Sequence, residues 1–177
     1  NTMKKKYTRE FLTIFLVVAT ELIGFGLIIP IMPQIATQFE SNKLLLGILF
    51  GGYSFCQLIA SPILGTLSDK YGRKPILLLS KFGTVIAYVI FAVSFSYWGL
   101  LIARLLDGFT GGNISVARAY IIDITEPEDR ARGMAIIGMS FGVGFLLGPA
   151  IGGFLFGQFD THTIPALVAS SCSLVAF

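Results

Sequence analysis

The sequence predicts an all-α membrane protein with six transmembrane helices. Of its 177 residues, 54% are hydrophobic and only 13% are charged, whereas a soluble domain carries about 25% charged residues. The mean hydropathy is +0.79. The charges stand in short groups between apolar runs, and a run of roughly 20 residues crosses about 30 Å of hydrocarbon. This pattern excludes a water-soluble globule, and it lacks the clustered basic face that nucleic-acid binding needs.

The predicted spans cover residues 11–33, 44–67, 75–95, 97–122, 133–156 and 163–177. The basic residues before the first run resemble the start of a signal peptide, but that run is too long and lacks a small-residue cleavage site. We therefore interpret it as a retained first span. The last run is short for a crossing helix and stops without a polar cap. We expect that helix to be truncated and the chain to end inside a longer parent.

The distribution of Lys and Arg among the short loops predicts the orientation. The N-terminal segment, the loop after the second span and the loop after the fourth span hold four, three and two of them, and the alternate loops hold only Lys43. The basic side and the N-terminus are therefore expected in the cytoplasm, with the protein in the cytoplasmic membrane. Lys81 and Arg118 are expected near the cytoplasmic ends of their spans, where long side chains reach the interface, but Arg104 lies deeper.

Helix-breaking residues gather in the first and fourth spans, at Gly24, Gly26, Pro30 and Pro33 and at Gly108, Gly111 and Gly112. Irregular segments at corresponding places in two halves are typical of inverted repeats. We expect one three-helix repeat over residues 1–95 and a second, incomplete one over residues 96–177.

Glu21 is the first candidate functional residue. It lies ten residues into its span, roughly 15 Å deep at the helical rise. A carboxylate at that depth must be neutral, paired or in contact with water. Burial favours its protonated form, so Glu21 is a candidate proton carrier. The alternative is a structural Glu held by polar neighbours.

Arg104 and Glu21 are predicted to lie within about one helical turn of each other in depth. If the first and fourth spans are neighbours, the two side chains can pair directly or through water, and a proton can switch that pair. The alternative is that Arg104 pairs with Asp107, three residues on along the same helix.

The loop after the second span combines turn-forming glycines with charges at the membrane surface. Its candidate residues are Gly65, Asp69, Gly72, Arg73 and Lys74, with Asp123 at the end of another cytoplasmic connection. A positive-inside anchor would explain the basic residues but not the two aspartates. We expect Asp69, Arg73 and Asp123 to form a gating cluster that holds one conformation.

Small residues recur every four positions in the fifth span, at Gly144, Gly148 and Gly152, with Pro149 and Gly153 beside them. That spacing gives a flat ridge on which another helix backbone packs closely, and Pro149 can bend its helix. Gln57 and Asn113, in the second and fourth spans, either line a substrate cavity or bond between helices. His162 is expected to be incidental, and no metal, cofactor or hydrolase pattern is present.

These motifs resemble those of the major facilitator superfamily. The loop matches the family pattern at Gly65, Leu67, Asp69, Gly72, Arg73 and Lys74, and residues 100–108 resemble the fourth-helix motif, with Asp107 where Gln is usual. Residues 144–153 resemble the antiporter motif. Residues 21–26 resemble the first-helix motif of drug:proton antiporters, with Glu21 where Asp is common. Residues 119–125 and 130–132 are similar to those of tetracycline and multidrug efflux pumps, although Ala87 stands where several tetracycline pumps have an acid.

The resemblance implies the N-terminal six-helix half of a secondary active transporter, not an enzyme. Two such bundles would expose a central cavity to each side in turn and exchange protons, the only energy source, for an amphipathic or cationic drug. Glu21, Arg104 and Asp107 would couple protons, and Gln57 and Asn113 would line the cavity. The partners would be the drug, protons, lipid and the missing six-helix half.

Two other functions stay open. One is a major facilitator transporter of another small metabolite, which the antiporter ridge makes less favoured if the transport is import. The other is a nontransporting scaffold or receptor, which would not need an acid and a base at matched depth. The sequence does not determine the substrate, the proton stoichiometry or the oligomeric state.

Overall fold

The computed structural model describes residues 2–38 and 43–175 as a bundle of long helices without strands in that part of the chain. Two residues of the predicted last span, 176 and 177, and the side chains of the predicted N-terminal anchor at Lys4, Lys5 and Lys6 lie outside the described part. The helices are α1 (Thr2–Ile28), α2 (Met32–Gln38), α3 (Lys43–Tyr71), α4 (Arg73–Val93), α5 (Tyr97–Thr110), α6 (Asn113–Ile124), the short 3-10 helix η1 (Pro127–Asp129), α7 (Arg130–Phe159) and α8 (Thr163–Val175).

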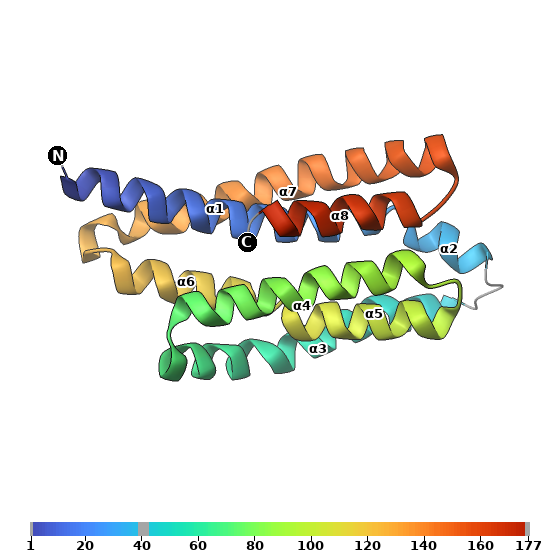
Figure 1. The fold of residues 1–177 in the computed structure, drawn as a ribbon, viewed down its shortest axis with the longest axis horizontal. Coiled ribbons are helices and arrows are strands. Elements are labelled where there is room, and N and C mark those ends of the chain that lie inside the picture. The colour runs from blue at the N-terminus through green and yellow to red at the C-terminus, as the bar shows by residue number, and fades with distance from the viewer. Residues whose placement is uncertain (1, 39–42, 176–177) are drawn as a thin grey trace.

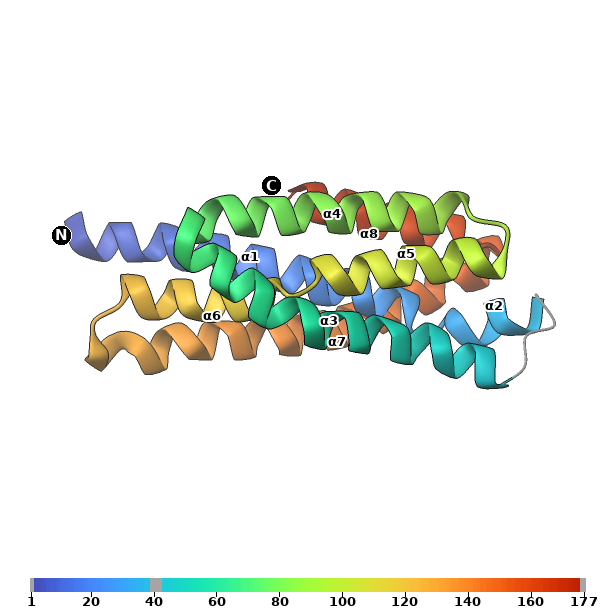
Figure 2. The ribbon, with the colours of Figure 1, turned by 90° about the horizontal axis from the view of Figure 1, so that it is seen from below.

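The long helices run along one axis and alternate in direction (Figures 1 and 2). The N-terminus, the α3–α4 turn and the η1 link lie at one end, which we call the η1 end. The α4–α5 and α7–α8 links and α2 lie at the opposite end. Within the described residues, four segments are long and apolar enough to cross a membrane: Arg9–Ile35, Lys43–Tyr71, Arg73–Val93 and Pro127–Phe159. This alternation places all three basic segments of the sequence at the η1 end.

Two of the six predicted spans are interrupted. The first breaks between α1 and α2, where Pro30 has no amide hydrogen to continue the helical ladder. The fourth is divided into α5 and α6 at Gly111 and Gly112, two of the helix-breaking residues identified in that span. The first break lies near the end with α2, whereas the second lies beside Glu21. The two breaks therefore lie at different depths.

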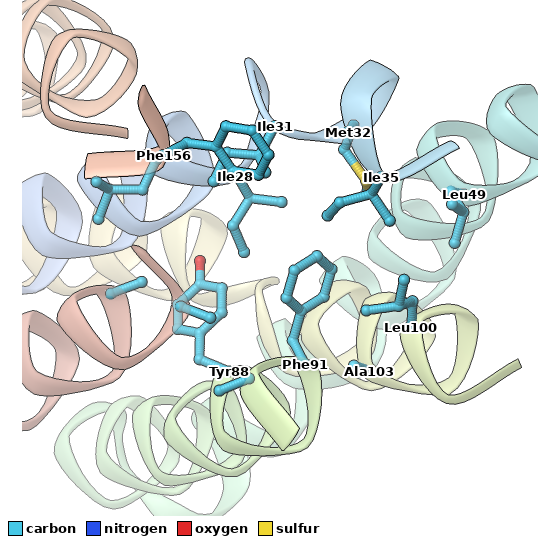
Figure 3. Close-up of a cluster of buried hydrophobic side chains, with 14 residues drawn as sticks. Ile28, Ile31, Met32, Ile35, Leu49, Tyr88, Phe91, Leu100, Ala103 and Phe156 are labelled. Carbon is cyan, nitrogen blue, oxygen red and sulfur yellow. The ribbon is translucent and has the colours of Figure 1, made fainter. Parts of the chain in front are cut away.

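Two apolar clusters form the core. One gathers buried side chains of α1, α2, α3, α4 and α5 with others of α7 and α8, and Figure 3 shows Tyr88 and Phe91 of α4 facing Ile28 and Ile35 within it. The other, toward the η1 end, joins Ile14, Val17, Val18 and Leu22 to α4, α6 and α7. Along α4 the residues between the two clusters include Lys81 and Thr84, which are fully buried polar side chains.

Glycines bring α7 against α1. A Cβ atom on Gly148 would lie 2.7 Å from the Cα of Gly26, and Cβ atoms on Gly144 and Gly152 would meet Leu22 and Leu27. Gly153, one position along the helix, has open space around it. The ridge predicted from the spacing of four therefore packs on α1, and Gly153 is not part of that contact.

His162 joins the two links at the end opposite η1. Its ring is 4% exposed, its Nε2 lies 2.9 Å from the carbonyl oxygen of Ser94, and it packs edge-on against Phe91 and Phe95. Burial lowers the pKa of His162, which favours the neutral ring with Nε2 donating its hydrogen to Ser94. The expectation that His162 is incidental is wrong for packing, because it ties the α7–α8 link to the end of α4.

The glycine contact gives a matched pair of substitutions within one helix. We expect Gly148→Ala to lower the thermal unfolding midpoint of the full-length protein in detergent, because overpacking a tight contact costs roughly 1–3 kcal/mol. Gly153→Ala should leave the midpoint unchanged or raise it, because alanine is the better helix former and has room there. Equal effects of the two substitutions would contradict the proposed packing of the ridge.

Candidate functional site

A layer of buried charged and polar side chains separates the two apolar clusters. Its charged members are Glu21 of α1, Lys81 of α4, and Arg104 and Asp107 of α5, each at most 2% exposed. Charged side chains are almost never fully buried unless they are paired. Four such residues in one layer, in helices that the sequence places in the membrane, make this layer the candidate functional site.

Three side chains from two other helices, α4 and α6, hydrogen-bond to Glu21 of α1. Lys81 donates from Nζ to Glu21 Oε2 over 2.9 Å, and Asn113 donates from Nδ2 to the same oxygen over 3.0 Å. Thr84 donates to Oε1 at 3.4 Å. Lys81 also donates to the hydroxyl of Thr20 at 3.0 Å. The carboxylate therefore joins α1 to α4 and to the start of α6.

Lys81 is buried in the layer and is not at the membrane interface, where the sequence predicted it. Lys81 does not reach the interface: it is 0% exposed and forms an ion pair with Glu21. Counting residues from the end of the span gave its depth but not its direction. A usable pattern was present, because Leu77, Lys81, Thr84, Tyr88 and Phe91 follow the helical spacing of three and four that marks one buried face.

Arg104 pairs with Asp107 and not directly with Glu21. Its Nη1 donates to Asp107 Oδ2 over 2.9 Å, which is the alternative pairing that the sequence left open. The guanidinium carbon also lies 4.3 Å from the ring centroid of Tyr53 and 5.5 Å from that of Phe25. Arg104 Nε and Asp107 Oδ1 are buried without a hydrogen-bond partner among the described residues.

The turn between α5 and α6 completes the layer. Gly111 permits it to lie against Glu21, because a Cβ atom there would be 3.3 Å from Oε1. Gln57 of α3 donates from Nε2 to the Gly111 carbonyl over 2.9 Å and borders a groove on the α3–α6 surface. Gln57 thus both bonds between helices and lines a cavity. Asn113, which is 0% exposed, only bonds between helices here, so its predicted place in a cavity wall is not what the structure shows.

The structure brings together the residues of the predicted gating cluster. Arg73 donates from Nε to Asp123 Oδ2 over 2.8 Å and forms an ion pair with Asp69, and it also bonds to Ser68. Gly72 has φ 97°, a backbone conformation that favours glycine. It lets the chain reverse between α3 and α4 so that Arg73 faces the end of α6.

The other two loop residues lie apart from that cluster. Lys74 pairs with Glu10 of α1 at 3.2 Å. Gly65 has open space around its Cα. Among the described residues, Lys74 forms no ion pair with Asp69 or Asp123.

Comparison with known proteins identifies the class. The family model of the Major Facilitator Superfamily matches residues 14–177, so the chain belongs to this superfamily of transporters and is a multi-pass membrane protein. The chain is 38% identical over 170 residues to the class H tetracycline resistance protein of Pasteurella multocida, which covers 94% of this chain and 42% of that protein. It is also 38% identical over 157 residues to the class B protein of Escherichia coli, covering 87% and 39%.

Among solved structures, the human organic anion transporter MFSD10 (TETRAN) superposes with a TM-score of 0.82. It is 28% identical, and the match covers 96% of this chain and 45% of that one. The chain thus spans about two fifths of the length of the curated relatives it matches. The expected fold, a major facilitator helix bundle, is confirmed.

Removing one partner of the Glu21–Lys81 pair tests the importance of the layer. We expect Lys81→Met to destabilise the full-length protein by about 3–5 kcal/mol, because it leaves a buried carboxylate unpaired. The double variant Lys81→Met/Glu21→Gln should recover much of that loss. Thermal unfolding in detergent measures both.

Lys74→Met is the matched control, because it removes a lysine of the same helix whose ion pair lies near the surface. Its effect should stay within about 1 kcal/mol. A double variant as unstable as Lys81→Met alone would contradict the pairing.

Proposed function

We propose that this chain forms one six-helix half of a proton-coupled exporter of amphipathic, drug-like molecules. The exporter would sit in the cytoplasmic membrane with the η1 end in the cytoplasm, as the loop charges predict. The observation that carries the proposal is the carboxylate of Glu21, buried in mid-span against Lys81. The similarity to tetracycline resistance proteins supports it.

Protonation of Glu21 would change the contact between helices. The ionised carboxylate accepts hydrogen bonds from Lys81, Thr84 and Asn113 and so draws α1, α4 and α6 together. A protonated Glu21 would leave Lys81 as a buried cation without a counter-charge, at a cost of several kcal/mol. Binding of a proton would therefore favour another arrangement of these helices, which is what coupling of protons to alternating access requires.

The Arg104–Asp107 pair would assist this change. Arg104 Nε and Asp107 Oδ1 have no hydrogen-bond partner among the described residues. When Lys81 or Glu21 loses its partner, these atoms are available to a water or a shifted side chain in the same layer. Asp107 would then be a second acid in the proton pathway, and Arg104 would stabilise its ionised form.

The Asp69–Arg73–Asp123 cluster would act as the cytoplasmic gate. It ties the α3–α4 turn to the end of α6 through exposed aspartates, whose side chains are 64% and 50% accessible. Charges that are so accessible can also contact a second bundle. We propose that the cluster stabilises the outward-facing conformation and opens when the cavity faces the cytoplasm.

Transport of another class of small molecule is the second candidate. It is favoured by the fold match to MFSD10, whose structure is described as that of an organic anion transporter. The two candidates share the proton layer and the gate and differ in the substrate.

Glu21→Gln tests the proton role in the full-length protein. In inside-out vesicles we expect proton-driven drug uptake to fall at least about tenfold, because a neutral amide cannot carry the proton. Drug binding without a gradient should persist. Glu10→Gln, three turns away in the same helix, is the control and should keep most of the uptake. Unchanged coupled uptake in Glu21→Gln would refute the carrier role.

Charge reversal at Asp69 tests the gate. Asp69→Lys places a second cation beside Arg73, so we expect the turnover rate to fall more than drug affinity does. Glu128→Lys, an exposed charge reversal at the same end of the bundle, should leave both near the wild-type values. If Asp69→Lys changes neither quantity, the loop is only a membrane anchor.

A further inference from the structure

Among the charged residues of the six predicted spans, Arg118 of α6 is the one without an ion pair in the described part of the chain. Glu21 pairs with Lys81, and Arg104 pairs with Asp107. Arg118 is exposed and has no ion pair or side-chain hydrogen bond among the described residues. A free guanidinium does not stay in lipid. It reaches the membrane interface, as expected from its place near the end of the span, or it faces water, a ligand or another part of the protein.

The groove beside Arg118 carries polar side chains that the outer face of α4 lacks. Between residues 75 and 93, the exposed side chains of α4 are all apolar, as on Leu79, Phe82 and Val93. In Figure 2, α6 and α7 lie along the lower edge, away from α4 and α8 at the upper edge. The side of the bundle that carries Arg118 is thus not the outer face of α4.

Two grooves meet at Arg118. On one side is a groove of about 360 Å³ between α3 and α6, lined by Leu58 and Ile114 together with neutral hydrogen-bonding groups. Its polar lining consists of Ser54, Gln57, Ser61, Gly111 and Ser115. On the other side is a groove of about 450 Å³ between α6 and α7, with an apolar wall formed by Met134, Ile137, Gly138 and Phe141. Both volumes are in the range of small-molecule sites.

We propose that these grooves form the binding site for an amphipathic organic anion. The carboxylate, sulfonate or enolate of the anion pairs with Arg118, its other polar groups bond to Ser61, Ser115 and Gln57, and its apolar body lies on Ile137 and Phe141. Neither groove is lined by an acidic residue, so a cation has no counter-charge there. This inference rests on the proposed transport function and replaces the expected cationic drug with an anion.

The shape of the site favours a small molecule over an acidic side chain from elsewhere in the protein. A single carboxylate would need only the guanidinium. The hydroxyl wall would then be unused, and so would the open space at Gly138, where a Cβ atom would have no neighbour within 4 Å. An amphipathic anion would contact the guanidinium, the hydroxyl groups and the open space at Gly138.

A pair of dyes with one ring system and opposite charge tests the proposal. The full-length protein in detergent at pH 7.5 is titrated into 6-carboxyfluorescein, an anion, and into rhodamine 123, a cation, and the anisotropy of each is measured. We expect tighter binding of the anion. Arg118→Gln should weaken anion binding at least about tenfold and leave rhodamine binding unchanged, and Arg118→Lys should restore part of the affinity.

Two further variants separate the site from general effects. Arg9→Gln removes another arginine without an ion pair among the described residues, one that lines a different groove between α1 and α4, and should leave anion binding unchanged. Gly138→Leu adds an apolar side chain in the groove at a position where a Cβ atom has no neighbour within 4 Å, and should weaken anion binding, whereas Gly157→Leu, at another such position on α7, should not.

The results distinguish this inference from the proposed proton coupling, because binding is measured without a gradient. Anion affinity that is unchanged in Arg118→Gln would overturn the inference even if Glu21 carries the proton. Equal losses for both dyes would also overturn it, since that is the behaviour of an arginine paired with another part of the protein. Arg118-dependent anion binding would stand even if Glu21→Gln still exported drug.

Discussion

The ion pair of Glu21 with Lys81 is the interaction on which the bundle depends, because a lone charge in the middle of a span is too costly to keep. The pair fixes α1 against α4, and Asn113 extends the bond to α6. The α5–α6 turn then has to lie beside the carboxylate, which only a small residue at Gly111 permits. One buried carboxylate thus determines the relative positions of four helices and explains why the fourth span is broken at that depth.

Close helix contacts surround this layer. Glycines stand where backbones meet: Gly148 and Gly144 of α7 against α1, and Gly108 of α5 against the carbonyl of Tyr53 on α3. Small residues at such contacts let van der Waals packing act over the length of a helix, the main attraction available in lipid. The apolar clusters above and below the layer then exclude water from it.

Much of the fold could be predicted because hydropathy and helix breakers act locally. Most helix ends lie within a few residues of the predicted span ends, although α1 begins at Thr2, well before the predicted start at residue 11. The motifs around Asp69 and Gly148 indicated the family. The contacts between residues of the layer were harder to predict. The position of a residue along a helix gives its depth in the membrane, whereas its partners depend on the face of the helix on which it lies. Lys81 was therefore placed at the interface, although its spacing from Tyr88 and Phe91 puts it on the buried face. Arg104 pairs with Asp107 three residues on in α5, the local alternative, and residue spacing could not decide between this partner and Glu21.

The charge of the substrate decides whether the membrane potential drives its export. The described bundle neutralises its own buried charges in two pairs and leaves Arg118 for an anion. If each proton that enters is exchanged for one monovalent anion that leaves, two positive charges in effect move inward per cycle. A membrane potential contributes about 2.3 kcal/mol per charge per 100 mV. An interior-negative potential would then drive anion export directly, whereas exchange of a proton for a monovalent cation moves no net charge and uses only the pH gradient. The charge on Arg118 would thus determine both the substrate class and the part of the proton-motive force that drives its export.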